Sequence, residues 1–243
     1  MLSLDQQNKF REQYRQINPG WRPATEVYAK LVRGRLDPAS RLLDLGCGRG
    51  GLVEQIHHPL ENIVGLDPDW GSLSEHRLAG ARPPLPRVVG VNGELPFGDG
   101  AFDLVIASWV LEHLSTPLAD FKQIRRLLRP NGSFIFITPN RRHPVITLNH
   151  LSARYSSLQK RLVQGVYGRG SEDTFRAYYR ANSACDLKML AAGAGLNLVN
   201  LDIIADPTYF AFSPAFFSFS MRIERRLPSG RRIHLVGEMQ LAD

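Results

Sequence analysis

Short apolar runs alternate with segments of helical spacing between residues 41 and 139, and this alternation dominates the chain. The runs are nearly continuous in apolar side chains, which is typical of strands buried on both faces of a sheet. We expect five such strands, at Arg41–Leu45, Asn62–Leu66, Arg87–Val91, Phe102–Ala107 and Ser133–Thr138. The segments between them predict helices at about Gly50–His58, Ser72–Leu78 and Pro117–Leu128.

The same pattern returns near the end of the chain. A helix is expected over Ser183–Ala194, stopped by Gly195, and strands at Leu198–Ile204 and near Ile233–Met239. Parallel strands need crossover connections, which are right-handed and usually helical. The sequence therefore predicts an α/β fold: a Rossmann-like, doubly wound, mostly parallel seven-stranded sheet with helices on both faces.

Two regions stand outside this alternation. The first 35 residues have a helical pattern that is broken at Pro19-Gly20. Residues 140–182 are polar and rich in Arg, His and Tyr, and they are too long for a simple connection. We expect them to form an inserted lid region after the fifth strand.

Charge is unevenly distributed along the 243 residues, whose formal net charge is +7. Residues 1–120 carry 12 Lys or Arg against 15 Asp or Glu, whereas residues 121–243 carry 18 against 8. An anionic partner, such as a phosphate, a carboxylate or a membrane surface, would explain the basic second half. A general bias towards arginine, spread over a solvated surface, explains it as well, because 25 of the 30 basic residues are Arg.

Targeting and redox signals are sparse. The N-terminal segment lacks the apolar core of a secretory signal, and no apolar stretch is long enough to span a bilayer. Cys47 lies in a glycine loop and Cys185 far downstream, which does not suggest a disulfide framework. We expect a cytoplasmic protein, either a monomer or a homodimer.

A glycine loop follows the first predicted strand, at Asp44–Gly51. Its glycines at 46, 48 and 51 satisfy G-x-G-x-x-G, so a dinucleotide is formally possible. However, Asp44 would repel a pyrophosphate, whereas it suits a cationic ligand such as the α-amino group of a methionine moiety. Asp67 ends the second strand, where a carboxylate binds ribose hydroxyls; the alternative is a turn or cap residue.

Four blocks resemble the class I S-adenosylmethionine-dependent methyltransferases, in particular the type 11 branch. Leu42–Leu52 is similar to the glycine signature D-x-G-x-G-x-G of that family. The other three blocks, in the family's order, are Glu94–Phe97 with Phe102–Val105 ("E-x-LPF … FD-x-V"), Ser108–Leu114 ("VLEH") and Leu128–Gly132 ("LKPGG"). The resemblance covers residues 40–140 and thins beyond them.

The resemblance implies S-adenosylmethionine as the cofactor, with its methionine end at the glycine loop and its ribose at Asp67. The family's adenine-binding Asp is replaced here by Asn92, whose amide oxygen accepts the same hydrogen bond. Trp109 is expected either near the sulfonium, through cation–π attraction, or in the core. The expected cofactor-binding residues are Asp44, Gly46, Cys47, Gly48, Asp67, Pro68, Asn92, Gly93, Glu94, Ser108 and Trp109.

On the acceptor side the sequence offers His143, His113 and His150 as candidates for a general base. His143 lies just after the fifth strand, and the alternative for His113 is a hydrogen-bonded packing residue. Tyr178, Tyr179 and Arg180 end the insertion, where they line an acceptor pocket or pack a lid. No metal site is expected, because the adjacent Glu112 and His113 would point in different directions on a helix. The Phe-rich run Tyr209–Phe219, flanked by arginines, suggests a greasy pocket, a contact with an anionic membrane, or core covering the sheet.

These expectations combine into one domain, residues 1–243. It comprises a helical cap (1–38), a donor-binding core (39–139), an acceptor or lid insertion (140–182) and the last part of the sheet (183–243). The predicted activity is methyl transfer, by O-methylation, to a small-molecule or lipid- or sugar-linked acceptor. Alternatives are an RNA-modifying methyltransferase, a non-catalytic donor-binding protein and an NAD-dependent oxidoreductase. The absence of the N/D-P-P-Y/F tetrad after the fourth strand disfavours methylation of exocyclic nitrogens of DNA or RNA bases and leaves other reactions on RNA open.

Overall fold

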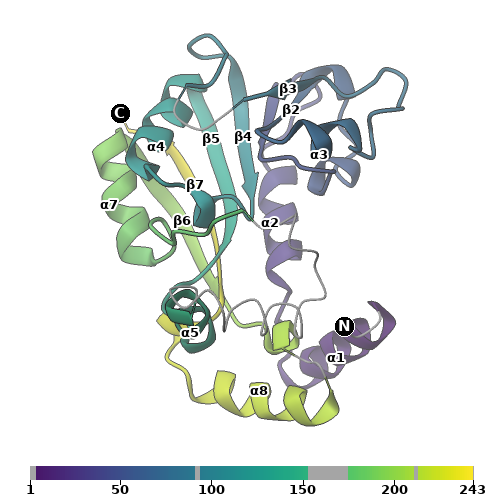
Figure 1. Ribbon diagram of the computed structural model, residues 1–243, viewed down its shortest axis with the longest axis vertical. Helices are drawn as coiled ribbons and strands as arrows, with labels where there is room; N and C mark the ends of the chain where they lie inside the picture. The colour runs from purple at the N-terminus through teal and green to yellow at the C-terminus, as the bar shows by residue number, and fades with distance from the viewer. Residues whose placement is uncertain (1–3, 91–93, 153–174, 211–212, 243) are drawn as a thin grey trace.

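The computed structural model describes residues 4–90, 94–152, 175–210 and 213–242. Within them a seven-stranded sheet has the order β3-β2-β1-β4-β5-β7-β6 (Figure 1). The strands are β1 (Leu42–Leu45), β2 (Ile63–Asp67), β3 (Arg87–Val89), β4 (Phe102–Ser108), β5 (Leu128–Pro139), β6 (Leu196–Ile204) and β7 (His234–Leu241). The predicted fold is confirmed, with one refinement: β7 runs antiparallel to both of its neighbours, so the sheet is mixed.

Helices cover both faces of the sheet. Alternate residues of each central strand point to opposite faces, so each strand contributes apolar side chains to both. One face packs against α4 (Pro117–Leu127) and α7 (Ala184–Ala194), and the other against α2 (Ala24–Arg33). In β5, for example, Phe134 and Phe136 belong to the first cluster, and Ile135 and Ile137 to the second. All four side chains are fully buried, which explains the unbroken apolar run in the sequence.

Two predicted helices differ from the structure. The segment expected as a helix at Gly50–His58 contains only a short 3₁₀ turn, η1 (Leu52–Glu54). Gly50 and His57 both have positive φ, at 114° and 50°, and these left-handed residues interrupt an α-helix at each end. The next helix, α3, spans Trp70–Ser74, earlier than expected, because the Asp69 side chain caps it by accepting from the backbone N–H groups of Gly71 and Ser72.

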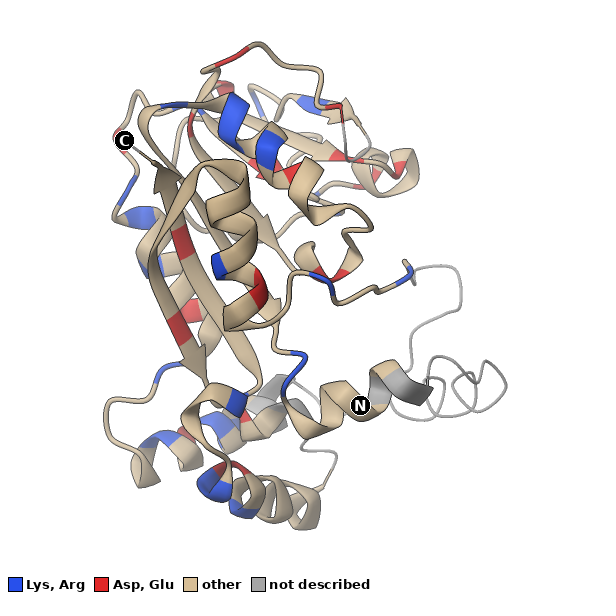
Figure 2. Ribbon diagram, turned by 90° about the vertical axis from the view of Figure 1, so that its left-hand side faces the viewer, with Lys and Arg blue, Asp and Glu red and all other residues tan. Residues whose placement is uncertain are grey.

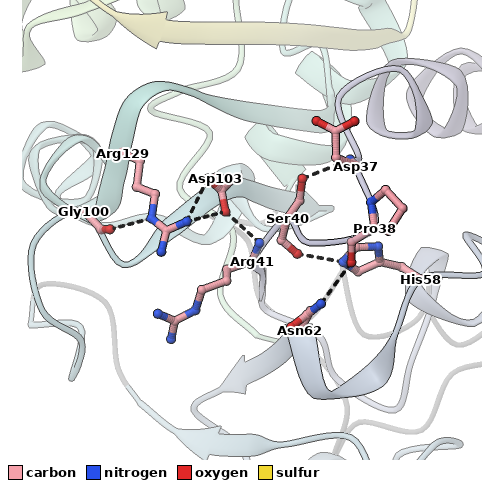
Figure 3. A network of polar contacts seen from close by, with 9 residues as sticks. All are labelled: Asp37, Pro38, Ser40, Arg41, His58, Asn62, Gly100, Asp103 and Arg129. Carbon is pink, nitrogen blue, oxygen red and sulfur yellow. Dashed lines mark hydrogen bonds and ion pairs between the residues drawn. The ribbon is translucent and has the colours of Figure 1, made fainter.

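The amino ends of the strands are joined by a network of polar contacts (Figure 3). The carboxylate of Asp103 in β4 accepts from the Arg41 backbone N–H at 2.8 Å and from the Arg129 guanidinium at 3.0 and 3.1 Å. His58 Nε2 lies 2.7 Å from the Ser40 carbonyl oxygen, so the loop before β1 is tied to the segment before β2. These contacts fix the connecting loops at the amino ends of the strands. The glycine loop lies at the opposite edge, where the strands have their carboxyl ends.

Beyond the carboxyl ends of the strands lie α1 (Leu4–Ile17), α5 (Pro144–Ser152) and α8 (Pro214–Arg226), at the lower end of Figure 1. Tyr209 and Phe210 of the Phe-rich run end a 3₁₀ turn, η5 (Pro207–Phe210), and the residues from Pro214 begin α8, which does not cover the sheet. Its Phe217, which is 3% exposed, instead stacks on Phe10 of α1 with ring centroids 4.4 Å apart. Part of this run, and of the insertion, lies outside the described residues.

Replacing Phe121 by alanine tests the packing of α4 on the sheet. The side chain is fully buried and its ring lies 5.7 Å from that of Phe134. We expect the change to lower the free energy of unfolding by about 3–5 kcal/mol, through lost transfer energy and an unfilled cavity. Leu118→Ala, on the exposed side of the same helix (41% exposed), should cost about 0.5 kcal/mol or less. Urea unfolding followed by circular dichroism measures both; equal losses would contradict this packing.

Candidate active site

Two carboxylates lie at the carboxyl ends of adjacent strands. Asp44 is the third residue of β1 and pairs in register with Gly65, and Asp67 is the last residue of the neighbouring strand β2. Their residues are only 5% and 6% exposed. Burying two like charges so close together is unfavourable unless hydrogen bonds or a cation compensate.

Asp67 is held by two backbone donors. The N–H of Gly48 donates to Oδ2 and the N–H of Asp69 to Oδ1, both at 2.9 Å. The carboxylate thus joins the glycine loop to the turn before α3, which is the turn role considered for it from the sequence. Each carboxylate oxygen has a second acceptor site, so this geometry leaves Asp67 able to accept from ribose hydroxyls as well.

The glycine loop turns sharply and leaves open space in front of one residue. Gly46 has a φ of 73°, and a Cβ there would lie 2.3 Å from Val110, so only glycine fits. Gly48 also has positive φ, but no atom lies within 4 Å of where its Cβ would be. A ligand can therefore approach the backbone at Gly48. Cys47 is different: its side chain is buried against Gly65, and burial raises the pKa of its thiol, which makes it a packing residue.

The surroundings of Asp44 disfavour the charged form of its carboxyl. Burial, reinforced by the charges of Asp67 and Glu54, raises the pKa of its carboxyl from 3.8 to about 7. A carboxylate that is hard to ionise alone is stabilised by a nearby cation. The sequence missed Glu54 as a contributor, because it lies in the segment that was expected to form a regular helix.

Tyr28 of α2 is a second residue that the sequence did not single out as part of a site. It is 2% exposed, and its hydroxyl has no hydrogen-bond partner among the described residues. Burial raises its pKa, and the charge of Asp44 adds to the effect, so the two side chains face the same region. In the sequence Tyr28 appears only as an apolar position of an N-terminal helix, and that pattern carries no information about its hydroxyl.

Ser108 and Trp109 follow at the end of β4. Trp109 has a φ of 60°, its N–H donates to the Ile137 carbonyl at 3.0 Å, and its ring packs in the core cluster beside α2. The ring also meets that of His234 edge-on, with centroids 5.1 Å apart. The rings of Trp109 and His234 therefore link the core to the carboxyl edge of the sheet. Of the remaining expected residues, Pro68 and Glu94 are exposed, and Asn92 and Gly93 lie outside the described residues.

Residues 175–180 lie against η3 (Leu111–His113), the turn that follows β4. The N–H groups of Tyr178 and Tyr179 donate to the Glu112 carbonyl at 2.7 and 3.1 Å, and Arg180 donates to the Ser115 carbonyl. His113 Nδ1 lies 3.1 Å from the Arg176 carbonyl oxygen. The structure thus brings His113 together with the three residues expected near the acceptor.

His143 lies elsewhere, between α5 and α8. Its Nδ1 accepts from the Val145 N–H at 3.3 Å, and its Nε2 lies 3.2 Å from Glu224 Oε1. Because Nδ1 is the acceptor, Nε2 carries the proton and donates it to the carboxylate. Nearby, the Nδ1 of buried His234 is 4.0 Å from Asp206 Oδ2, and burial lowers the pKa of His234 to about 4. His234 is therefore neutral at physiological pH, and its position at the start of β7 gave no sequence signal.

Among the described residues, no group of three or more His, Cys, Asp or Glu side chains converges as a metal site would require. None of the helices in this described part of the chain combines the length and the apolar character needed to cross a bilayer.

Known methyltransferases are similar to this chain in sequence. Residues 43–136 match the family described as a methyltransferase domain. Among related sequences, the malonyl-[acyl-carrier protein] O-methyltransferase of Legionella pneumophila is 36% identical over 47% of this chain and 41% of its own length. The ubiquinone biosynthesis O-methyltransferase of Chromobacterium violaceum is 29% identical over 66% of each chain. Residues 43–136 thus resemble the methyltransferase domain of the class I S-adenosylmethionine-dependent enzymes.

Solved structures of methyltransferases share the fold. The putative methyltransferase in complex with the Trm112 activator from Haloferax volcanii superimposes with a TM-score of 0.63, at 18% identity and 89% coverage of each chain. The geranyl diphosphate C-methyltransferase of Streptomyces coelicolor gives a TM-score of 0.62, at 15% identity, over 89% of this chain and 77% of that one.

The chain spans about two fifths of the length of the first curated relatives that it matches in sequence, for example 41% and 38%.

The residues present fit the cofactor of this family. S-adenosylmethionine is cationic at its sulfonium and α-amino groups, and Asp44 and Asp67 supply buried negative charge beside the open space at Gly48. The unpartnered hydroxyl of Tyr28 supplies one further polar group on the same side as Asp44.

Asp44→Asn should separate stability from binding. The raised pKa means that the wild-type chain loses stability as pH rises from about 4 to about 7, because the carboxyl ionises near pH 4 in the unfolded chain and only near pH 7 in the folded one. At pH 8 the ligand-free variant should therefore be more stable, on the order of 1–3 kcal/mol. Its affinity for S-adenosylmethionine should fall at least tenfold, since the cation loses a charged partner.

Thermal unfolding and calorimetric titration at pH 6 and pH 8 measure both effects. Wild-type affinity should rise with pH over this range, as Asp44 ionises, and the Asn variant should lose that dependence. Asp37→Asn, which changes an exposed carboxylate at the opposite edge, serves as the control and should alter neither quantity. An unchanged affinity in Asp44→Asn would contradict the role given to this residue.

Proposed function

We propose that this chain transfers a methyl group from S-adenosylmethionine to the oxygen of a small-molecule or lipid- or sugar-linked acceptor. The observation that carries the proposal is the buried pair Asp44 and Asp67 beside the open backbone at Gly48. A pyrophosphate would be repelled there, so a nicotinamide dinucleotide is disfavoured. Oxygen as the acceptor atom is supported by relatives named as O-methyltransferases.

The cofactor supplies an activated methyl group on a sulfonium, so the protein's task is to align the acceptor and exclude water. In this proposal the glycine loop and Asp44 hold the methionine end, and Asp67 holds the ribose. Ser108 and Trp109 border the sulfonium at the end of β4. Tyr178, Tyr179 and Arg180 lie against the next turn and line the acceptor side.

For the general base, the tautomers favour His113 over His143. A carbonyl oxygen only accepts, so the contact with Arg176 places the proton of a neutral His113 on Nδ1 and leaves Nε2 as the basic nitrogen. His143 has the opposite arrangement, with Nδ1 occupied by a backbone N–H and the proton of Nε2 directed at Glu224. Proton abstraction by His143 would require breaking one of these contacts first.

His113→Gln and His143→Gln form a matched pair that tests this assignment. With S-adenosylmethionine saturating, His113→Gln should lower kcat about 10²–10⁴-fold, because the base is lost. His143→Gln should retain kcat and instead lower the melting temperature, because the contact between His143 and α8 is weakened. Steady-state kinetics and thermal unfolding distinguish the two residues; the reverse result would exchange their roles.

Donor binding is tested first, by calorimetric titration with S-adenosylmethionine and with NAD. We expect S-adenosylmethionine alone to bind, and Asp67→Ala to weaken it more than tenfold, because the ribose loses a charged bidentate partner. Asp69→Asn is the control, since Asp69 caps α3 two residues away and its amide oxygen still accepts. A folded Asp67→Ala variant with unchanged affinity would refute the ribose assignment.

Turnover is tested next, by measuring S-adenosylhomocysteine formed over a panel of phenols, hydroxylated lipids, carboxylic acids, thioester-linked acids and tRNA. Product with an oxygen acceptor supports the proposal. Product with tRNA alone would favour an RNA-modifying enzyme. Tight donor binding without product on any acceptor would favour a non-catalytic donor-binding protein.

A further inference from the structure

Helix α8 has an inner face whose contacts are specific. Phe217 stacks on Phe10 of α1. Glu224, two turns later on the same side, is 7% exposed, and its Oε1 lies 3.2 Å from His143 Nε2. These contacts hold the helix against α1 and α5, so its orientation is fixed and its opposite side faces away from the sheet.

That outward side is apolar near its start and basic towards its end. Phe216 and Phe219 are 56% and 60% exposed, and Ile223 continues their stripe at helical spacing. Arg222 and Arg226 are exposed, one and two turns beyond Phe219, so they flank the stripe. Large exposed aromatic side chains on a fixed helix are typical of a surface that binds something.

The exposed charged side chains of α8 and of the segment after it are all basic. Residues 213–232 contain five arginines, all exposed: Arg222, Arg225, Arg226, Arg231 and Arg232. The single acidic residue of the segment, Glu224, points inward to His143, so it does not neutralise the surface. Figure 2 shows Lys and Arg positions at this lower end of the molecule, on α8 and the segment after it.

We propose that the outward face of α8, defined by Phe216, Phe219, Ile223, Arg222 and Arg226, docks on an anionic lipid bilayer. Interfacial helices insert aromatic and aliphatic side chains at the boundary between headgroups and acyl chains, while arginines bind lipid phosphates. The stripe supplies the apolar contact and the arginines supply the charge complementarity. A folded acidic protein would match the charge, but two protruding aromatic rings bordered by arginine fit a deformable apolar layer better.

The position of α8 gives such docking a consequence. Glu224 joins the helix to His143, which closely follows β5, so α8 lies at the carboxyl edge of the sheet (Figure 1). Docking would bring that edge near the bilayer. Membrane binding does not depend on the proposed function, and it is measured without turnover.

The test is sedimentation of the full chain with vesicles of phosphatidylcholine alone, or with about one third phosphatidylglycerol, at low and at physiological salt. We expect binding to the anionic vesicles at least tenfold stronger than to the neutral ones, and weaker at higher salt because charges are screened. Phe219→Ser should reduce partitioning about tenfold through lost apolar burial. The double change Lys188→Ala with Met189→Ser removes one exposed cation and one exposed apolar side chain (Met189, 62% exposed) from α7, and should change nothing.

Charge is tested by Arg222→Ala with Arg226→Ala, which should lower anionic partitioning about 25-fold, at about fivefold per arginine. Arg222→Lys with Arg226→Lys keeps the charge and should retain most of the binding, so a folding defect is distinguished from lost charge. No binding to anionic vesicles at low salt, or equal loss in the α7 control, would overturn the proposal. So would lipid-free self-association abolished by Phe219→Ser, since the face would then join two copies of the chain.

Discussion

The carboxyl edge of the sheet is constrained by two buried carboxylates, Asp44 and Asp67, at the ends of adjacent parallel strands. Burying such groups costs free energy unless hydrogen bonds from the protein or a ligand of opposite charge compensate it. Asp67 is compensated from within, by the backbone N–H groups of Gly48 and Asp69. Asp44 is compensated less, and the pKa of its carboxyl is raised to about 7 by burial and by the neighbouring charges. We therefore propose that a cationic ligand supplies the compensation that Asp44 lacks, and that the ligand-free protein is less stable because this compensation is missing.

Other features of this edge follow from that constraint. The turn at Gly46 admits no side chain because Val110 occupies the space, and this brings the loop close to the strand end that carries Asp67. The loop can then donate the Gly48 N–H to that carboxylate while leaving room in front of its own backbone. A regular helix directly after the loop would not provide the same geometry. The structure instead has only a short turn at Leu52–Glu54, which brings Glu54 near enough to Asp44 to raise its pKa.

The sequence predicts local features well and long-range ones poorly. The strand positions follow from unbroken apolar runs, and the placement of Asp44 and Asp67 follows from their position at the ends of two such runs beside glycines. The helix expected at Gly50–His58 was wrong, because the backbone angles at Gly50 and His57 override a weak helical pattern. The sequence did not predict Tyr28 and His234 as site residues for another reason. Tyr28 is buried near Asp44 and His234 is buried near Asp206, and neither neighbour is close in the sequence.

The two edges of the sheet differ in how their charged side chains are compensated. At the amino edge, Asp103 is neutralised by Arg129 and the Arg41 backbone, so its charge is used within the protein. At the carboxyl edge, the carboxyl of Asp44 is left with incomplete compensation, and burial lowers the pKa of His234 so that this side chain is neutral. Glu224 extends this logic to the outside of the molecule. Because its carboxylate turns inward to His143, the arginines of α8 and the segment after it remain as an unneutralised surface. One inward contact thus both fixes the helix beside the carboxyl edge and leaves its outer side basic.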